Sequence, residues 1–155
     1  MTERTPWKFL DEYRGIAFPG VLPTLPELFR ITVSRNPDRA CFTVYDPDRV
    51  SLSYSQALAT IERLAAFLAS EGIHHGDKVA VTGKNTPEWA VAYLAVLFAG
   101  ATVVPIDYQI RHDEMEAIIK ASDAVAIFVD EEKYDAIDSG TLKLRAKWSL
   151  SRHKA

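Results

Sequence analysis

The chain has 155 residues, of which 48% are apolar and 25% are charged, a length and composition typical of one globular domain with an apolar core. Its formal net charge of −3 gives no overall positive field, which argues against nucleic acid or anionic lipid as a partner. Cys41 is the one cysteine, so internal disulfides and thiolate metal clusters are excluded and a reducing, cytoplasmic location is expected.

The first 21 residues combine charged and aromatic side chains with glycine and proline, which differs from the uninterrupted apolar core of a secretory signal. We expect an irregular N-terminal arm over residues 1–21. Its aromatic residues are Trp7, Phe9, Tyr13 and Phe18. Because aromatic side chains carry large burial energies, we expect the arm to pack on its own protein, with a partner's surface as the alternative.

The segment after the arm predicts a helix followed by a hairpin. Thr24 and Glu27 have the spacing of a capping box, which predicts a helix that ends near Asn36. Runs typical of strands, at residues 41–46 and 50–54, flank a turn rich in aspartate and proline, as in an antiparallel hairpin.

A longer helix and a strand follow the hairpin. Ser53 and Gln56 form a second capping-box pattern, and apolar residues then recur at steps of three and four as far as Gly72, which is typical of a helix stop. Residues 78–83 form a short apolar run, which predicts a strand covered on both faces.

Helices and strands then alternate as far as residue 138. Thr86 is expected to cap a helix over residues 88–99, with Pro87 in its first turn, and residues 102–106 predict the next strand. Another apolar stripe predicts a further helix and a buried strand after it. The residues concerned are Met115, Ile118 and Ile119 for the helix and 124–129 for the strand.

Short apolar strands that alternate with helices predict an α/β fold, with a mostly parallel sheet and helices on both faces. We expect this incomplete subdomain to span residues 22–138. Residues 139–155 carry five basic side chains and no acidic one, whereas the preceding 138 residues carry 21 acidic and 13 basic ones. We therefore expect a separate basic tail over residues 139–155, a junction that a shifted reading frame would produce.

Residues 89–106 carry no charge over 18 positions, which reaches the length of a transmembrane helix. A buried helix followed by a buried parallel strand produces the same run. The β-branched residues and Pro105 at its end favour the second structure, so we expect no transmembrane span. Peripheral contact with a membrane stays open.

Ligands of open α/β sheets bind at the carboxyl ends of the strands, here the loops at residues 82–85, 107–111 and 130–132. None of these loops has the glycine pattern that cradles phosphate. Gly72 and Gly76 precede a strand, whereas a cofactor loop follows one, so we do not expect them to bind a cofactor.

Other polar residues have a functional and a structural explanation. His112 lies among acidic residues, a group that suits metal ligation or acid–base chemistry, but an exposed helix N-terminus explains the same pattern and is preferred. His74 and His75 are expected to face solvent. Contact with a ligand and helix capping are equally good explanations for three further residues, Lys84, Asn85 and Glu88.

Asp107 directly follows the strand over residues 102–106. A carboxylate there acts as a general base only if a partner tunes its pKa, and the sequence indicates no such partner. Backbone amides that donate to Asp107 would instead fix the turn after Pro105, and we expect this structural role. The Ser-Gly-Thr run at residues 139–141 is also expected to form an ordinary turn.

An ordered set of motifs resembles the beginning of the AMP-forming adenylating enzymes, a superfamily of acyl-CoA synthetases, luciferases and adenylation domains of peptide synthetases. The residues that carry the resemblance are Leu52-Ser53-Tyr54-x-x-Ala57-Leu58, Leu64-Ala65-x-x-Leu68, Gly72, Gly76-Asp77-Lys78-Val79-Ala80-Val81, Asn85, Glu88-Trp89 and Ala99-Gly100-Ala101-x-x-Val104-Pro105-Ile106-Asp107. The resemblance covers residues 22–138. Residues 25–46, with the arm before them, resemble bacterial long-chain fatty-acid CoA ligases.

The resemblance implies a two-step reaction in a full-length parent enzyme, in which a fatty-acid carboxylate attacks ATP and the thiol of coenzyme A then displaces AMP. It implies ATP, Mg²⁺ and coenzyme A as cofactors. The family's phosphate loop, nucleotide contacts and C-terminal lid lie downstream of the matched segment. We therefore expect no catalytic, cofactor-binding or metal-binding residue in this chain, and no activity from the chain alone.

Two other interpretations stay open. One is a non-catalytic binding or oligomerisation module with the same partial fold, and the other is a membrane-associated protein anchored by residues 89–106. In the fragment interpretation, a domain cut part-way exposes apolar surface, so we expect marginal stability or aggregation. The oligomeric state and the acyl chain length do not follow from the sequence.

Overall fold

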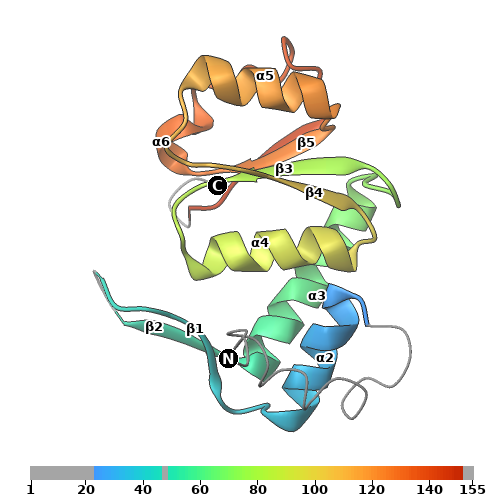
Figure 1. The fold of residues 1–155 in the computed structure, drawn as a ribbon, viewed down its shortest axis with the longest axis vertical. Helices are drawn as coiled ribbons and strands as arrows, with labels where there is room; N and C mark the ends of the chain where they lie inside the picture. Colours follow the sequence, from blue (N-terminus) through green and yellow to red (C-terminus); the bar gives the residue numbers. More distant parts are fainter. Residues whose placement is uncertain (1–22, 47–48, 152–155) are drawn as a thin grey trace, which may run out of the picture.

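The computed structural model describes residues 23–46 and 49–151, and their strands form two sheets (Figure 1). The smaller sheet is the antiparallel hairpin of β1 (Ala40–Val44) and β2 (Val50–Ser53), as the sequence predicts. The larger sheet is parallel, with strand order β4-β3-β5-β6. The N-terminal arm expected at residues 1–21 lies outside the described residues.

Helix α2 (Leu25–Arg35) begins where the sequence predicts. The Thr24 side chain accepts a hydrogen bond from the backbone N–H of Glu27, and the Glu27 carboxylate accepts one from the backbone N–H of Thr24 at 2.8 Å. Helix α3 (Tyr54–Ser70) has the second expected capping box, at Ser53. Both boxes satisfy backbone N–H groups that the start of a helix leaves without a partner.

The larger sheet is built around β3 (Lys78–Thr82). Helix α4 (Pro87–Phe98) connects it to β4 (Thr102–Ile106), and helix α5 (His112–Ser122) connects β4 to β5 (Ala126–Val129). Helices α3 and α4 pack on one face of the sheet and α5 packs on the other (Figure 1). The expected α/β fold, with a parallel sheet and helices on both faces, is confirmed.

Alternate residues of β3 enter two separate cores. Val79 and Val81 pack with α3 and α4, whereas Ala80 packs with Met115 and Ile119 of α5. Successive side chains of a strand point to opposite faces, so a strand covered on both faces must be apolar throughout. This requirement explains the continuous apolar run that identified the strand.

The uncharged run of residues 89–106 forms most of α4 and then β4. Helix α4 ends at Phe98, and Gly100 adopts a φ of +76° between helix and strand, a conformation that favours glycine. Among residues 23–46 and 49–151, no helix is both long enough and apolar enough to cross a membrane.

Strand β4 is less buried than the sequence analysis expected. It lies at an edge of the sheet and pairs only with β3, so Thr102 and Pro105 are exposed and Ile106 alone within the strand is fully buried. Proline has no backbone N–H to donate, which restricts it to edge strands or bulges. Pro105 is compatible with this edge position, which the sequence did not lead us to expect.

The structure places a strand in the segment expected to form a separate basic tail. Strand β6 (Ala146–Ser149) pairs in parallel with β5, after a short helix α6 (Glu131–Tyr134) that the sequence did not predict. Leu142, Leu144 and Leu150 are at most 8% exposed. The expected boundary at residue 138 therefore does not coincide with the end of the sheet.

Basic side chains of this segment have specific partners in the fold. Lys147 Nζ donates to the carbonyl oxygens of Tyr134 and Ile137 at 2.8 and 2.9 Å. Arg145 Nη1 lies 3.0 Å from Asp77 Oδ2 in an ion pair. These contacts give two of the five basic residues partners within the fold.

Candidate functional site

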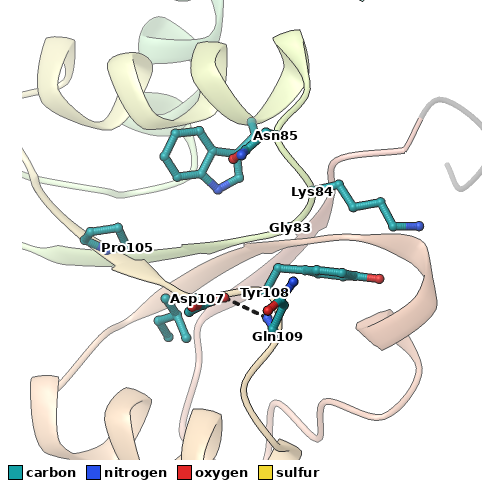
Figure 2. A pocket seen from close by; sticks show the side chains of 9 residues that line it. Gly83, Lys84, Asn85, Pro105, Asp107, Tyr108 and Gln109 are labelled. Carbon is teal, nitrogen blue, oxygen red and sulfur yellow. Dashed lines mark hydrogen bonds between the residues drawn. The ribbon is translucent and has the colours of Figure 1, made fainter. Parts of the chain in front are cut away.

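The chain leaves β3 and β4 toward opposite faces of the sheet, because α4 covers one face and α5 the other. In an open α/β sheet, such a change of direction leaves a crevice at the carboxyl ends of the two strands, where ligands bind. A cleft of about 700 Å³ lies at this position, lined by residues 83–85, Trp89 and residues 105–109 (Figure 2). We call it the β3–β4 cleft.

A second cleft, of about 350 Å³, lies on the other side of the loop that follows β3. We call it the β3–β5 cleft, and Lys84 lines both clefts. Asn85 lines the first cleft and Glu88 the second. The acidic residues of the loop after β5, Asp130 to Glu132, also line the second. The three loops that the sequence predicts as candidates for ligand binding therefore lie together at the carboxyl ends of the parallel strands.

The Glu132 carboxylate joins these loops. It accepts a hydrogen bond from the Tyr108 hydroxyl and forms an ion pair with Lys84 Nζ at 2.5 Å. The ammonium groups of Lys84 and Lys133 lie 5.6 and 5.0 Å from the centroid of the Tyr108 ring. Lys133 Nζ also donates to the carbonyl oxygens of Tyr108 and Ile110. The loops after β3, β4 and β5 are thus fastened to one another.

Hydrogen bonds shift the pKa of each member of this network. The pKa of Glu132 is lowered, first by its hydrogen bond with Lys84 and then by that with Tyr108. The pKa of Lys84 and that of Tyr108 are both raised, in each case mainly by the hydrogen bond to Glu132. All three pKa values move away from neutrality, whereas a general acid or base needs a pKa near the working pH. The network suits positioning and not proton transfer.

Gly83 allows the loops after β3 and β5 to approach closely. A Cβ atom at this position would lie 2.5 Å from Asp130 Oδ1 and 2.8 Å from Leu150 Cδ1. The other carboxylate oxygen of Asp130 accepts a hydrogen bond from the backbone N–H of Lys84 at 2.7 Å. Gly83 was not among the predicted site residues, although a glycine directly after a buried strand is the signal for such an approach.

Asp107 has the geometry of the structural role that the sequence analysis expected. Its Oδ1 accepts a hydrogen bond from the backbone N–H of Gln109 at 2.8 Å, which fixes the turn after β4 (Figure 2). Asn85 lies across the cleft from this turn, at the start of α4. Asp107 therefore lines the cleft through a side chain that is already bound to the backbone.

Among the described residues, no histidine lines either cleft. His112 Nε2 lies 3.2 Å from Glu116 Oε1 at the exposed start of α5, so its position is the expected helix N-terminus. His74 and His75 are exposed, as expected. Within the part of the chain that the structure describes, no group of three or more His, Cys, Asp or Glu side chains could hold a metal ion.

Residues 139–141 form the expected turn. The Asp138 carboxylate accepts hydrogen bonds from the Gly140 backbone N–H at 2.9 Å and from the Thr141 hydroxyl at 2.7 Å. This run therefore uses its hydroxyl and amide groups to close a turn on Asp138.

Residues 29–153 match the AMP-binding enzyme family. A long-chain-fatty-acid–CoA ligase of Bacillus subtilis is 33% identical over 132 residues, which cover 77% of this chain and 22% of the ligase. Surfactin synthase subunit 2 of the same organism is 34% identical over 134 residues, which cover 84% of this chain and 4% of the subunit. The chain therefore spans less than a quarter of the length of these relatives.

Solved structures share the fold. A Rhodopseudomonas palustris protein assigned to the long-chain-fatty-acid CoA ligases aligns with a TM-score of 0.75 and 26% identity, over 86% of this chain and 34% of that chain. Klebsiella oxytoca NpsA, in complex with 3-hydroxyanthranilyl-AMSN, aligns with a TM-score of 0.72 and 23% identity, over 83% of this chain and 25% of that chain. The parallel sheet with its flanking helices matches the N-terminal subdomain of adenylate-forming enzymes, and the chain belongs to the AMP-binding enzyme family.

Proposed function

We propose that the chain is the N-terminal segment of an ATP-dependent, AMP-forming ligase that joins long-chain fatty acids to coenzyme A. The observation that carries the proposal is the family match over residues 29–153. The fatty acid as substrate class is supported by the similarity to the B. subtilis ligase. A cytoplasmic location is proposed on the same basis, together with a single cysteine that suits a reducing compartment.

The proposed reaction has two steps. A carboxylate oxygen of the fatty acid attacks the α-phosphorus of ATP, and the bond from that phosphorus to pyrophosphate breaks. The thiol sulfur of coenzyme A then attacks the acyl carbonyl carbon, the thiol proton is lost, and AMP leaves with the electron pair of the broken bond. Phosphoryl chemistry of this kind depends on positioning and on neutralising the charge of the phosphates.

The described residues do not fit the triphosphate or its Mg²⁺. Lys84 is already paired with Glu132, and the second cleft is lined by acidic side chains that repel phosphate. The loop after β3 has no further glycine to bring backbone amides to an anion. We infer that this segment is a scaffold, that the nucleotide and metal are held by other parts of the enzyme, and that the segment alone is inactive.

The test is ATP–pyrophosphate exchange measured with palmitate. The assay compares the 155-residue chain with the longer protein obtained by joining this chain to the sequence encoded by the DNA downstream of it. We expect exchange from the longer protein only, and a glycine- and hydroxyl-rich phosphate loop in its added sequence. If the longer protein catalyses exchange with amino acids and not with palmitate, amino acids would replace fatty acids as the proposed substrate class. Exchange by neither protein would overturn the ligase assignment, and exchange by the short chain would overturn its proposed inactivity.

A further inference from the structure

An apolar groove lies between helix α2, strand β1 and helix α4. It has a volume of about 330 Å³. Leu25, Leu28 and Phe29 line it from α2, and Cys41 and Phe42 line it from β1. This hollow shares no lining residue with either cleft at the carboxyl ends of the parallel strands.

The groove continues along α4. A neighbouring hollow of about 370 Å³ shares Cys41 and Phe42 and reaches Pro87 and Trp89 at the start of that helix. Leu94 lines the first hollow, so the two together follow α4 from Pro87 to Leu94, a rise of about 10 Å. That length matches about three residues of extended chain. We call the two hollows together the Cys41 groove.

The α2 side of the Cys41 groove is poorly covered by the described residues. Leu25 is 54% exposed and Leu28 is 37% exposed. With Phe29 and Thr32 they follow the spacing of three, four and seven residues that marks the buried stripe of a helix. Val33 is the one fully buried residue of α2. A helix with this stripe is stabilised when another apolar segment covers it.

We propose that the N-terminal arm, residues 1–21, packs in the Cys41 groove. Helix α2 begins at Leu25, which lines the groove, so the arm precedes a groove residue by only a few positions in the sequence. Phe18 precedes Leu25 by seven residues, which span up to about 25 Å when extended. This reach exceeds the length of the groove along α4, so Phe18 can enter it without strain.

The composition of the arm also suits this groove. Residues 1–21 contain four aromatic side chains, and their three basic residues are balanced by three acidic ones. Proline disfavours the helical conformation in the residue directly before it, here Phe18 before Pro19 and Leu22 before Pro23. The other conceivable occupant, the same surface of a second copy, is distinguished by the experiment below.

The single cysteine makes the proposal testable by crosslinking. In the full 155-residue chain, Ala17→Cys places a thiol beside Phe18, and Ala121→Cys places a matched thiol on the exposed part of α5, on the opposite face of the large sheet. Under mild oxidation we expect an intrachain disulfide between Cys41 and the residue 17 thiol, identified by peptide mass mapping. We expect none with the residue 121 thiol.

Two outcomes of this experiment overturn the proposal. One is a yield of intrachain disulfide for Ala17→Cys no higher than for Ala121→Cys. The other is a disulfide of Ala17→Cys that forms only between chains, as seen on a non-reducing gel and diluted away at low protein concentration, which would assign the groove to a second copy.

A second measurement does not need an introduced cysteine. Partial burial raises the pKa of the Cys41 thiol to about 11, so its labelling by a maleimide is slow and is compared at one fixed pH. We expect Phe18→Ser to raise the labelling rate on the order of tenfold, because a covered thiol reacts through its open state. The control, Tyr45→Ser, alters an aromatic residue that is 73% exposed and leaves the rate unchanged. Equal rates for the two variants would contradict the proposal.

Discussion

The two edges of the large sheet are built differently. At the β4 edge, Pro105 removes a hydrogen-bond donor and Thr102 is exposed. At the β6 edge there is no proline, every residue of the strand is half-buried, and Trp148 packs against Phe128 and Phe67 with ring centroids 4.9 and 5.8 Å apart. Proline is a common means of blocking an edge strand. Pro105 therefore blocks pairing at one position of the β4 edge, whereas the β6 edge has no such block and is held by packing.

The largest expected effect tests whether packing holds the β6 edge. Leu144→Ala removes a side chain that is 8% exposed, and we expect a loss of about 3 kcal/mol in the free energy of unfolding. Val104→Ala, at a half-buried position of β4, is the matched truncation and is expected to cost about 1 kcal/mol. Urea unfolding followed by circular dichroism gives both values. Equal losses would show that the two edges are held alike.

A second prediction concerns the approach of the loops near β6. Gly83→Ala forces a Cβ atom onto Asp130 and Leu150, and we expect a loss of about 2 kcal/mol in the free energy of unfolding. Gly140→Ala is the control, because its nearest neighbour would lie 3.3 Å away, on the Asp138 side chain. Thermal unfolding compares the two variants. The interpretation fails if Gly83→Ala is no less stable than Gly140→Ala.

The ion pair between Asp77 and Arg145 anchors the segment before β6. It predicts that the free energy of unfolding depends on pH. The pKa of Asp77 is lowered, first by a hydrogen bond from the His74 backbone N–H and further by the charge of Arg145. A lowered folded-state pKa means that the carboxylate stabilises the fold above its unfolded pKa, about 3.9, and that this contribution is lost as the pH falls through the folded value.

We therefore expect Asp77→Asn to cost about 1 kcal/mol at pH 7 and to approach wild-type stability as the pH falls below 4. Urea midpoints measured at a series of pH values check this. Glu62→Gln is the control, since Glu62 forms an exposed ion pair with Arg30, between α3 and α2, and not with the segment before β6. A constant difference between Asp77→Asn and wild type across this range would exclude Asp77 as the titrating group.

The smallest expected change in stability tests the blocked edge directly. Pro105→Val restores a backbone N–H on β4, and we expect the free energy of unfolding to change by less than about 1 kcal/mol. Self-association should instead increase, because an unblocked edge strand pairs with other chains. Sedimentation velocity over a range of concentrations measures it, with Thr102→Val as the control for added apolar surface. No difference between the two variants would mean that Pro105 does not block the edge.

The elements that the sequence predicts are those whose signals are local. The capping residues Thr24 and Ser53 lie three residues from their partners, and the strand over residues 102–106 has the predicted bounds. Strand β6 has the sequence Ala-Lys-Trp-Ser, whose apolar and polar residues alternate over only four positions, within a segment that its basic residues set apart as a tail. Its conformation depends on pairing with β5, and strand propensity is decided by such context. That is why the strand was missed.

The candidate site likewise contains some features that the sequence predicts and others that it does not. The loops after β3, β4 and β5 lie together because parallel strands have their carboxyl ends on the same side of the sheet. The hydrogen bond from Tyr108 to Glu132 spans 24 residues and the one from Lys84 spans 48. No spacing rule relates residues so far apart, so their contact appears only in the folded chain. Asp107 and Gln109 are two residues apart, and their turn could be predicted.

Because Lys84 lines both clefts, a ligand in one cleft can alter the charge that faces the other. A ligand that draws its ammonium group into the β3–β4 cleft separates it from Glu132, whose carboxylate then faces the β3–β5 cleft without that counter-charge. Such a ligand therefore gives up the Lys84–Glu132 ion pair when it binds, and its net affinity is lowered by whatever that pair contributes.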